Sequence, residues 1–115
     1  MPIMTTGGIR RLEVAEQVLA QGVAVVGIGT ALAMCPDLPT RWRNGSPTGK
    51  LEPTITIKDK MLAALATMAM IRRQLQRIGK GKLPLPNANV MFTIISDQLR
   101  GKRLTSRYRR WIEGR

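Results

Sequence analysis

Two glycine-containing turns are the part of this chain best suited to chemistry. Gly7-Gly8 follow a short apolar run, and Gly27-Ile28-Gly29-Thr30 close a β-branched run. Glycine allows unusual backbone angles and close approach, so each turn can direct backbone N–H groups at an anion near the start of a helix. Taken alone, either cluster is better explained as a structural turn whose glycines supply the backbone angles. Two such turns after consecutive strands favour a phosphate site.

The composition excludes many other kinds of chemistry. The chain has no histidine, which rules out a Ser-His-Asp triad, a Cys-His pair and an imidazole metal ligand. Cys35 is the single cysteine, so no intramolecular disulfide can form and a reducing, cytoplasmic location is expected. We expect its thiol to be buried or inert. We therefore predict no catalytic residue and no metal site in this chain.

Residues 1–45 contain the elements that would hold the two turns. Runs at 2–5 and 23–29 predict strands, the second of a type that parallel sheets bury on both faces. Between them, apolar residues recur at three- and four-residue steps and predict an amphipathic helix ended by Gly22. A short helical stretch is expected over 37–42. Two parallel strands alone leave both sheet edges unpaired, so this half needs further strands.

The positive charge lies almost wholly in the second half. The net charge is +12. Residues 1–57 hold five basic and four acidic side chains, whereas residues 58–115 hold fourteen basic and three acidic ones. A stretch rich in Gly, Pro and Ser separates the two parts. We predict a first segment at 1–45, a linker at 46–57 and a helical basic extension at 58–115.

The basic extension is expected to be helical. Apolar spacing predicts a helix over 58–78, residues 79–86 break it, and residues 89–99 form a second apolar stretch before a basic tail. Tyr108 and Trp111 in that tail could stack on nucleic-acid bases, lie on a lipid headgroup layer, or pack on a parent domain. No apolar run reaches the roughly 20 residues of a membrane span.

The first 42 residues resemble the closing βαβ segment of the Old Yellow Enzyme family, the NADH:flavin oxidoreductases. In that family a TGG(F/I)R turn ends strand seven, a (V/L)G(I/L)(A/G) turn ends strand eight, and DPDLP-like residues follow. Here residues 6–10, 26–29 and 36–39 match these motifs in order and spacing. The basic helical remainder is similar to a C-terminal extension of some members.

The resemblance implies a fold, a cofactor and a site. The fold would be α/β, a partial (β/α)8 barrel made of its last two βα units, strands 7 and 8, followed by the basic extension. Backbone amides of Gly7, Gly8, Gly29 and Thr30 would hold the phosphate of FMN. Many relatives have arginine at the position of Thr30, so here Arg10 or Arg11 would supply the charge.

The resemblance also implies what lies outside this chain. The family's hydride transfer from NAD(P)H to a small-molecule acceptor uses residues on earlier strands, including histidines. We therefore expect an FMN-dependent NAD(P)H oxidoreductase segment that is inactive alone and has the remainder of the barrel, or a full-length homologue, as its partner. The alternative from another class is that the helices of residues 58–115 form a nucleic-acid-binding or assembly module.

Overall fold

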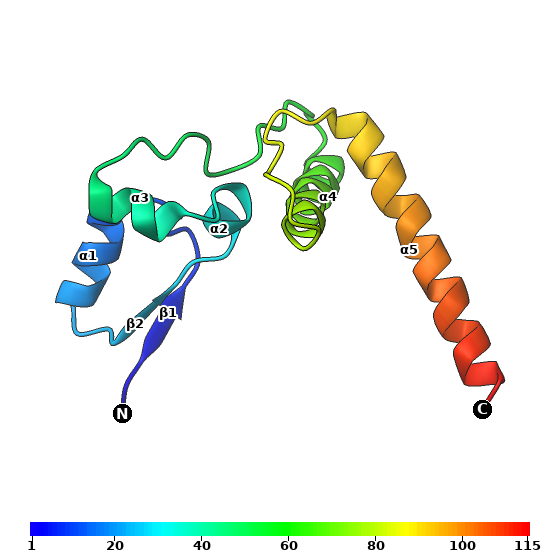
Figure 1. The fold of residues 1–115 in the computed structure, drawn as a ribbon, viewed down its shortest axis with the longest axis horizontal. Helices are drawn as coiled ribbons and strands as arrows, with labels where there is room; N and C mark the ends of the chain where they lie inside the picture. The colour runs from blue at the N-terminus through cyan, green and yellow to red at the C-terminus, as the bar shows by residue number, and fades with distance from the viewer.

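The computed structural model describes all 115 residues, and its regular structure is mainly helical (Figure 1). Two short strands and three short helices occupy the first part of the chain, and two long helices occupy the second. Residues 45–59 between these parts contain neither helix nor strand. The elements are β1 (Met4–Thr6), α1 (Leu12–Ala20), β2 (Val25–Gly27), α2 (Thr30–Met34), α3 (Leu38–Asn44), α4 (Lys60–Ile78) and α5 (Val90–Glu113).

The two strands form one parallel pair. Met4 lies opposite Val25, and Thr6 lies opposite Gly27. Each strand has three residues, because Gly7-Gly8 turn the chain away from β1 with positive φ angles and α2 begins soon after β2. The predicted strands and the helix between them therefore exist, but each is shorter than the sequence pattern suggests.

The expectation of a partial (β/α)8 barrel is wrong. The structure is small and rich in helix, and its only sheet has two strands. The side chains of Met4 and Val25 are 62% and 52% exposed, so these strands are not buried on both faces as barrel strands are. A short β-branched run bounded by glycines has the same local pattern whether or not other strands flank it.

A small apolar cluster holds the first part together. Ala31, Cys35 and Leu38 are buried at the junction of α2 and α3. The less buried side chains that pack on them include Leu51, which follows α3 by several residues. The cluster fixes α2, and with it the turn that leads from β2 into that helix.

A second cluster joins the two long helices. Ala66 and Ala69 of α4 are buried against Ile94 of α5, because alanine lets two helix backbones approach closely. Each helix has a side-chain N-cap: the Asp59 carboxylate accepts from the Leu62 N–H at 2.8 Å, and the Asn89 amide oxygen accepts from the Phe92 N–H at 2.9 Å. α4 also contacts α2, which connects the two parts of the molecule.

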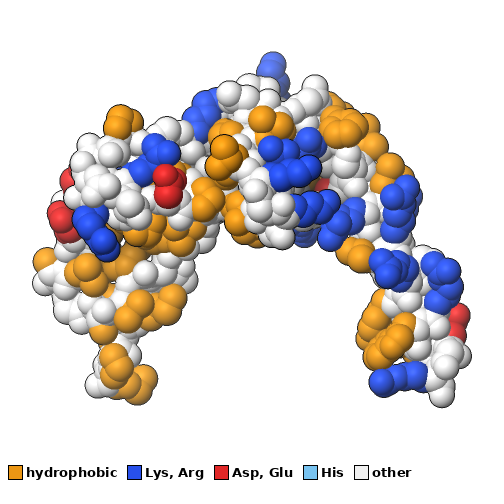
Figure 2. All heavy atoms as spheres, in the orientation of Figure 1, with side chains coloured by type: hydrophobic (Ala, Val, Ile, Leu, Met, Phe, Trp, Pro, Cys, Tyr) orange, Lys and Arg blue, Asp and Glu red, His pale blue; other side chains and the backbone are white.

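α5 extends well beyond its contact with α4. Figure 1 shows the last turns of α5 standing away from the rest of the chain, and every residue from 98 onward is exposed. Residues 89–99 and the basic tail, which the sequence presents as two stretches, are one helix. Basic side chains gather over α4 and α5 (Figure 2). No helix combines the length and the apolar character needed to cross a membrane.

Candidate anion-binding site

The parallel register brings the two glycine-containing turns side by side. Because Thr6 and Gly27 are the last paired residues, the chain leaves both strands at the same edge of the sheet. A hollow of about 160 Å³ lies at that edge. Its walls are Thr6, Gly7, Gly8, Ile9, Arg10, Gly27, Gly29, Thr30 and Ala31. All four residues predicted to bind a phosphate, Gly7, Gly8, Gly29 and Thr30, therefore line one hollow.

The first turn presents free backbone donors. Gly7 and Gly8 have φ angles of 112° and 69°, which residues with a side chain rarely adopt. The N–H groups of Gly7, Gly8 and Gly29 donate no hydrogen bond to another backbone group. The expectation that Gly7-Gly8 open a helix is wrong, because α1 begins only at Leu12. A loop presents these amides, and buried Ile9 anchors it.

The two glycines of the second turn have different physical roles. A Cβ added to Gly27 would lie 2.6 Å from Met4 Cε and 2.9 Å from Thr6 Cβ, so the packing of β1 on β2 requires a glycine there. Gly29 has a φ of −108°, and an added Cβ would meet nothing within 4 Å. Neither packing nor backbone conformation requires glycine at position 29. Gly29 lines the hollow, and the space beside its Cα is open.

Arg10 is the one basic residue that lines the hollow, and it forms an ion pair with a carboxylate. The Arg10 guanidinium lies 2.8 Å from a carboxylate oxygen of Glu52, which is not among the lining residues. Both side chains are about half exposed, so the pair contributes little to stability. Glu52 follows the first segment, and nothing in the local sequence pattern indicates this pairing.

The arrangement suits a phosphate group. Free N–H donors, the Thr30 hydroxyl and a guanidinium can all donate hydrogen bonds to phosphate oxygens. The hollow is small, so it matches a phosphate rather than the three-ring flavin. No three side chains of the metal-binding types converge anywhere in the chain.

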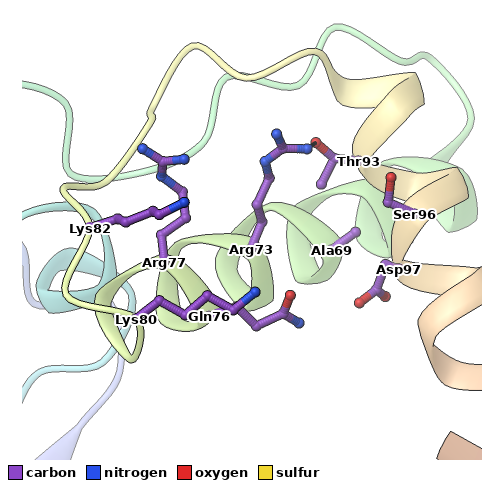
Figure 3. Close-up of a pocket in the computed structure, with 9 residues that line it drawn as sticks. All are labelled: Ala69, Arg73, Gln76, Arg77, Lys80, Lys82, Thr93, Ser96 and Asp97. Carbon is purple, nitrogen blue, oxygen red and sulfur yellow. Dashed lines mark hydrogen bonds between the residues drawn. The ribbon is translucent and has the colours of Figure 1, made fainter.

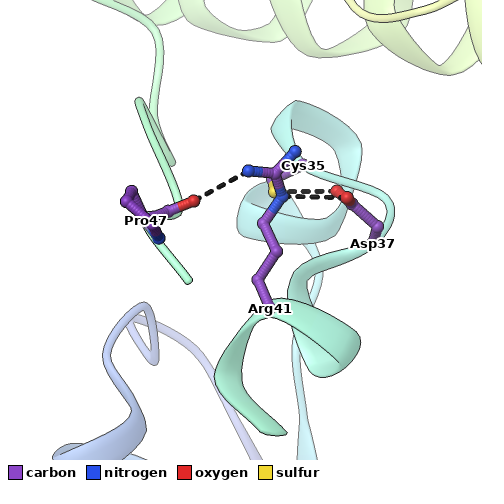
Figure 4. A network of polar contacts seen from close by, with 4 residues as sticks. All are labelled: Cys35, Asp37, Arg41 and Pro47. Atoms are coloured by element: carbon purple, nitrogen blue, oxygen red, sulfur yellow. Dashed lines mark hydrogen bonds and ion pairs between the residues drawn. The ribbon is translucent and has the colours of Figure 1, made fainter. Parts of the chain in front are cut away.

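A second polar cluster surrounds the single cysteine (Figure 4). The Cys35 thiol donates to one carboxylate oxygen of Asp37 at 3.2 Å, and Arg41 donates to the other at 2.8 Å. Arg41 also donates to the carbonyl oxygen of Pro47. Burial, followed by the hydrogen bond and charge of Asp37, raises the pKa of the thiol. The sequence predicted a buried thiol, and Cys35 is buried and held in its neutral form.

Comparison of the chain with models of known protein families, with curated proteins and with solved structures gave no match.

Proposed function

We propose that this chain supplies the phosphate-binding turns of an FMN-dependent NAD(P)H oxidoreductase whose remaining parts come from a partner polypeptide. The observation that carries the proposal is the hollow at the edge of the parallel pair. Both glycine-containing turns contribute residues that line that one hollow. The resemblance of residues 6–10, 26–29 and 36–39 to flavin oxidoreductases supports FMN as the phosphate-bearing group.

Within this proposal the residues of this chain bind the phosphate of FMN and thereby orient the cofactor. The amides of Gly7, Gly8 and Gly29 and the Thr30 hydroxyl donate to the phosphate, and Arg10 supplies charge once it separates from Glu52. When bound, FMN supplies the hydride chemistry between NAD(P)H and a small-molecule acceptor. The chain contributes no proton donor to that reaction, so we expect no NAD(P)H turnover by the isolated 115 residues.

The exposed sheet supports a partner polypeptide. β1 and β2 each have one neighbour, which leaves a free edge on both sides of the pair. Ile3, Met4 and Val25 beside these edges are apolar and more than half exposed. Free edges with apolar side chains readily pair with another chain. A partner that adds strands there would cover these apolar side chains, and the enzyme would co-purify as this chain with its partner.

A comparison of FMN with riboflavin tests the phosphate site, because the two flavins differ only by the phosphate. We expect FMN, added to the isotope-labelled chain, to shift the NMR signals of the Gly7, Gly8 and Gly29 amides. Riboflavin should leave them unchanged. Gly29→Ala should weaken FMN binding severalfold, because it adds a methyl group at a residue that lines the hollow, and this methyl group meets no other protein atom.

The matched control is Gly101→Ala, which also adds a methyl group in open space but on α5. It should bind FMN as the unaltered chain does. The proposal is wrong if FMN and riboflavin shift the same signals equally, or if the shifts caused by FMN lie away from the two turns.

A further inference from the structure

Basic side chains converge on a pocket between α4 and α5 (Figure 3). The pocket has a volume of about 220 Å³. α4 contributes residues on one face at helical spacing, the following turn contributes two lysines, and α5 contributes three polar residues. The lining residues are Ala69, Arg73, Gln76, Arg77, Lys80, Lys82, Thr93, Ser96 and Asp97.

Four cations and one carboxylate line the pocket. None of Arg73, Arg77, Lys80 and Lys82 forms an ion pair, because the three ion pairs of the molecule involve other cations. The one carboxylate of the pocket, Asp97, lies 2.8 Å from Arg72 and is neutralised by it. Arg73 and Arg77 are four residues apart on one helix, a spacing at which like charges destabilise the helix. The cluster therefore costs stability until an anion binds.

The turn after α4 holds the two lysines in place. The Lys82 N–H donates to the Arg77 carbonyl and the Gly81 N–H donates to the Ile78 carbonyl, both at 2.9 Å. Gly81 has a φ of 68°. This pattern is a Schellman motif, which fixes the chain direction at a helix end. The backbone that carries both lysines is thus set before any ligand binds.

Two further contacts hold the loop between α4 and α5 against α4. Gln74 is fully buried, and its amide group exchanges two hydrogen bonds with the backbone of Leu85, at 3.1 and 2.7 Å. The Arg77 Nε donates to the Leu83 carbonyl at 2.8 Å, which orients its guanidinium. These bonds hold the loop against α4, and the last of them fixes Arg77, which lines the pocket.

The opposite side of the pocket positions Arg73 and adds neutral donors. The Arg73 guanidinium donates to the Thr93 hydroxyl at 3.1 Å and lies 5.4 Å from the centre of the Phe92 ring. Ser96 and Gln76 add a hydroxyl and an amide to the walls. Charged and neutral donors around one hollow are the combination that phosphate oxygens accept.

We propose that the pocket between α4 and α5 binds a phosphate group, either of a small polyphosphate or of a nucleic-acid backbone. The C-terminal end of α4 carries a partial negative charge of about half a unit, which opposes an anion. Four whole positive charges outweigh it. The site is separate from the hollow at the sheet edge and does not depend on the function proposed for that hollow.

The test uses the full chain, two probes and two double variants that each remove two positive charges. Lys80→Gln with Lys82→Gln changes the pocket, and Arg109→Gln with Arg110→Gln changes the exposed end of α5. All four side chains are exposed, so circular dichroism should show intact helices in both. The probes are inorganic pyrophosphate, followed by NMR, and a fluorescent 12-nucleotide single-stranded RNA, followed by anisotropy.

We expect pyrophosphate to shift the amide signals around Lys80, Lys82 and Ser96. The pocket variant should weaken its binding at least about tenfold, whereas the tail variant should change it less than about twofold. If pyrophosphate shifts no signal of the pocket, the proposal is wrong. If both variants weaken its binding equally, the attraction is diffuse and the proposal is also wrong.

The RNA probe distinguishes the two sources of phosphate. A nucleic-acid ligand should bind more tightly than pyrophosphate, lose affinity in both variants because it continues along α5, and weaken steeply with salt. A small polyphosphate as the natural ligand would appear as pyrophosphate binding that exceeds RNA binding. Either result supports a phosphate site in this pocket.

Discussion

At the scale of single residues, Asp37 sets the properties of two neighbours. Its Oδ1 accepts from the Cys35 thiol and its Oδ2 accepts from Arg41. The bond from Arg41 and the bond from Cys35 lower the pKa of the Asp37 carboxyl, so it stays charged in mildly acidic solution. That negative charge, added to burial, raises the pKa of the Cys35 thiol above its ordinary value of 9.0.

The thiol therefore has a predictable dependence on pH. In the unfolded chain it ionises near pH 9.0, whereas in the folded chain it stays neutral to a higher pH. The unfolded state thus releases its proton first as the pH rises. The contribution of the neutral thiol to stability is fully present below pH 9.0 and is lost above it.

We predict that Asp37→Asn makes Cys35 more reactive. The substitution keeps the shape of the side chain but removes the charge that opposes thiolate formation, so the thiol pKa falls. Since only the thiolate reacts, alkylation by iodoacetamide at pH 8 should become severalfold faster. The chain unfolded in urea gives the upper limit of the rate. An unchanged rate in the variant would show that burial alone protects the thiol.

At the scale of elements, Gly101 lies inside a long helix without a packing reason. An added Cβ would meet nothing within 4 Å, and the surrounding residues are exposed. Glycine in a helix interior costs about 1 kcal/mol relative to alanine. The half of α5 that stands away from α4 is therefore stabilised mainly by interactions within the helix. Gly101 lowers the stability of that half.

We predict that Gly101→Ala slows hydrogen exchange in this half of α5. A gain of about 1 kcal/mol corresponds to about fivefold slower exchange of the amides over 98–113. Amides in the middle of α4 serve as the internal control and should not change. Equal exchange rates in the variant and the unaltered chain would contradict a continuous helix through residue 101.

Local patterns in the sequence predicted the elements that depend on local interactions. The helix expected over 58–78 is confirmed as Lys60–Ile78, and the two strands are confirmed in shorter form. The glycine pattern indicated the two turns, and the family resemblance implied Gly7, Gly8, Gly29 and Thr30, which are four of the residues that line the hollow. The pairing of Arg10 with Glu52 and the pocket between α4 and α5 depend on residues far apart in sequence, and no periodicity reports such contacts.

At the scale of the whole molecule, the chain is open and thinly packed. Its radius of gyration is 17.4 Å, whereas a compact domain of this length has about 13 Å. Only 15 of 115 residues are buried, so the apolar contribution to folding is small. Figure 2 shows an arch, with the first part of the chain on one side, α5 on the other, and the connection between them near the top. Electrostatic forces therefore weigh heavily in the stability of this fold.

Repulsion dominates those forces, because the net charge is +12 and only three ion pairs exist, each with at least one half-exposed partner. Salt screens repulsion between distant exposed charges more than it weakens such pairs. We predict that raising NaCl from about 20 to about 300 mM increases Tm by several degrees. A fall in Tm would mean that the ion pairs outweigh the repulsion.

A comparison of Tm in sodium phosphate and in NaCl at equal ionic strength separates general charge screening from specific binding of phosphate. Sodium phosphate should raise Tm more than NaCl does, because an anion that binds only the folded state stabilises it by mass action. The part of the gain specific to phosphate should shrink in the variant that lacks Lys80 and Lys82, since its pocket loses two of four cations. General screening should remain in that variant, because it still carries a large positive charge.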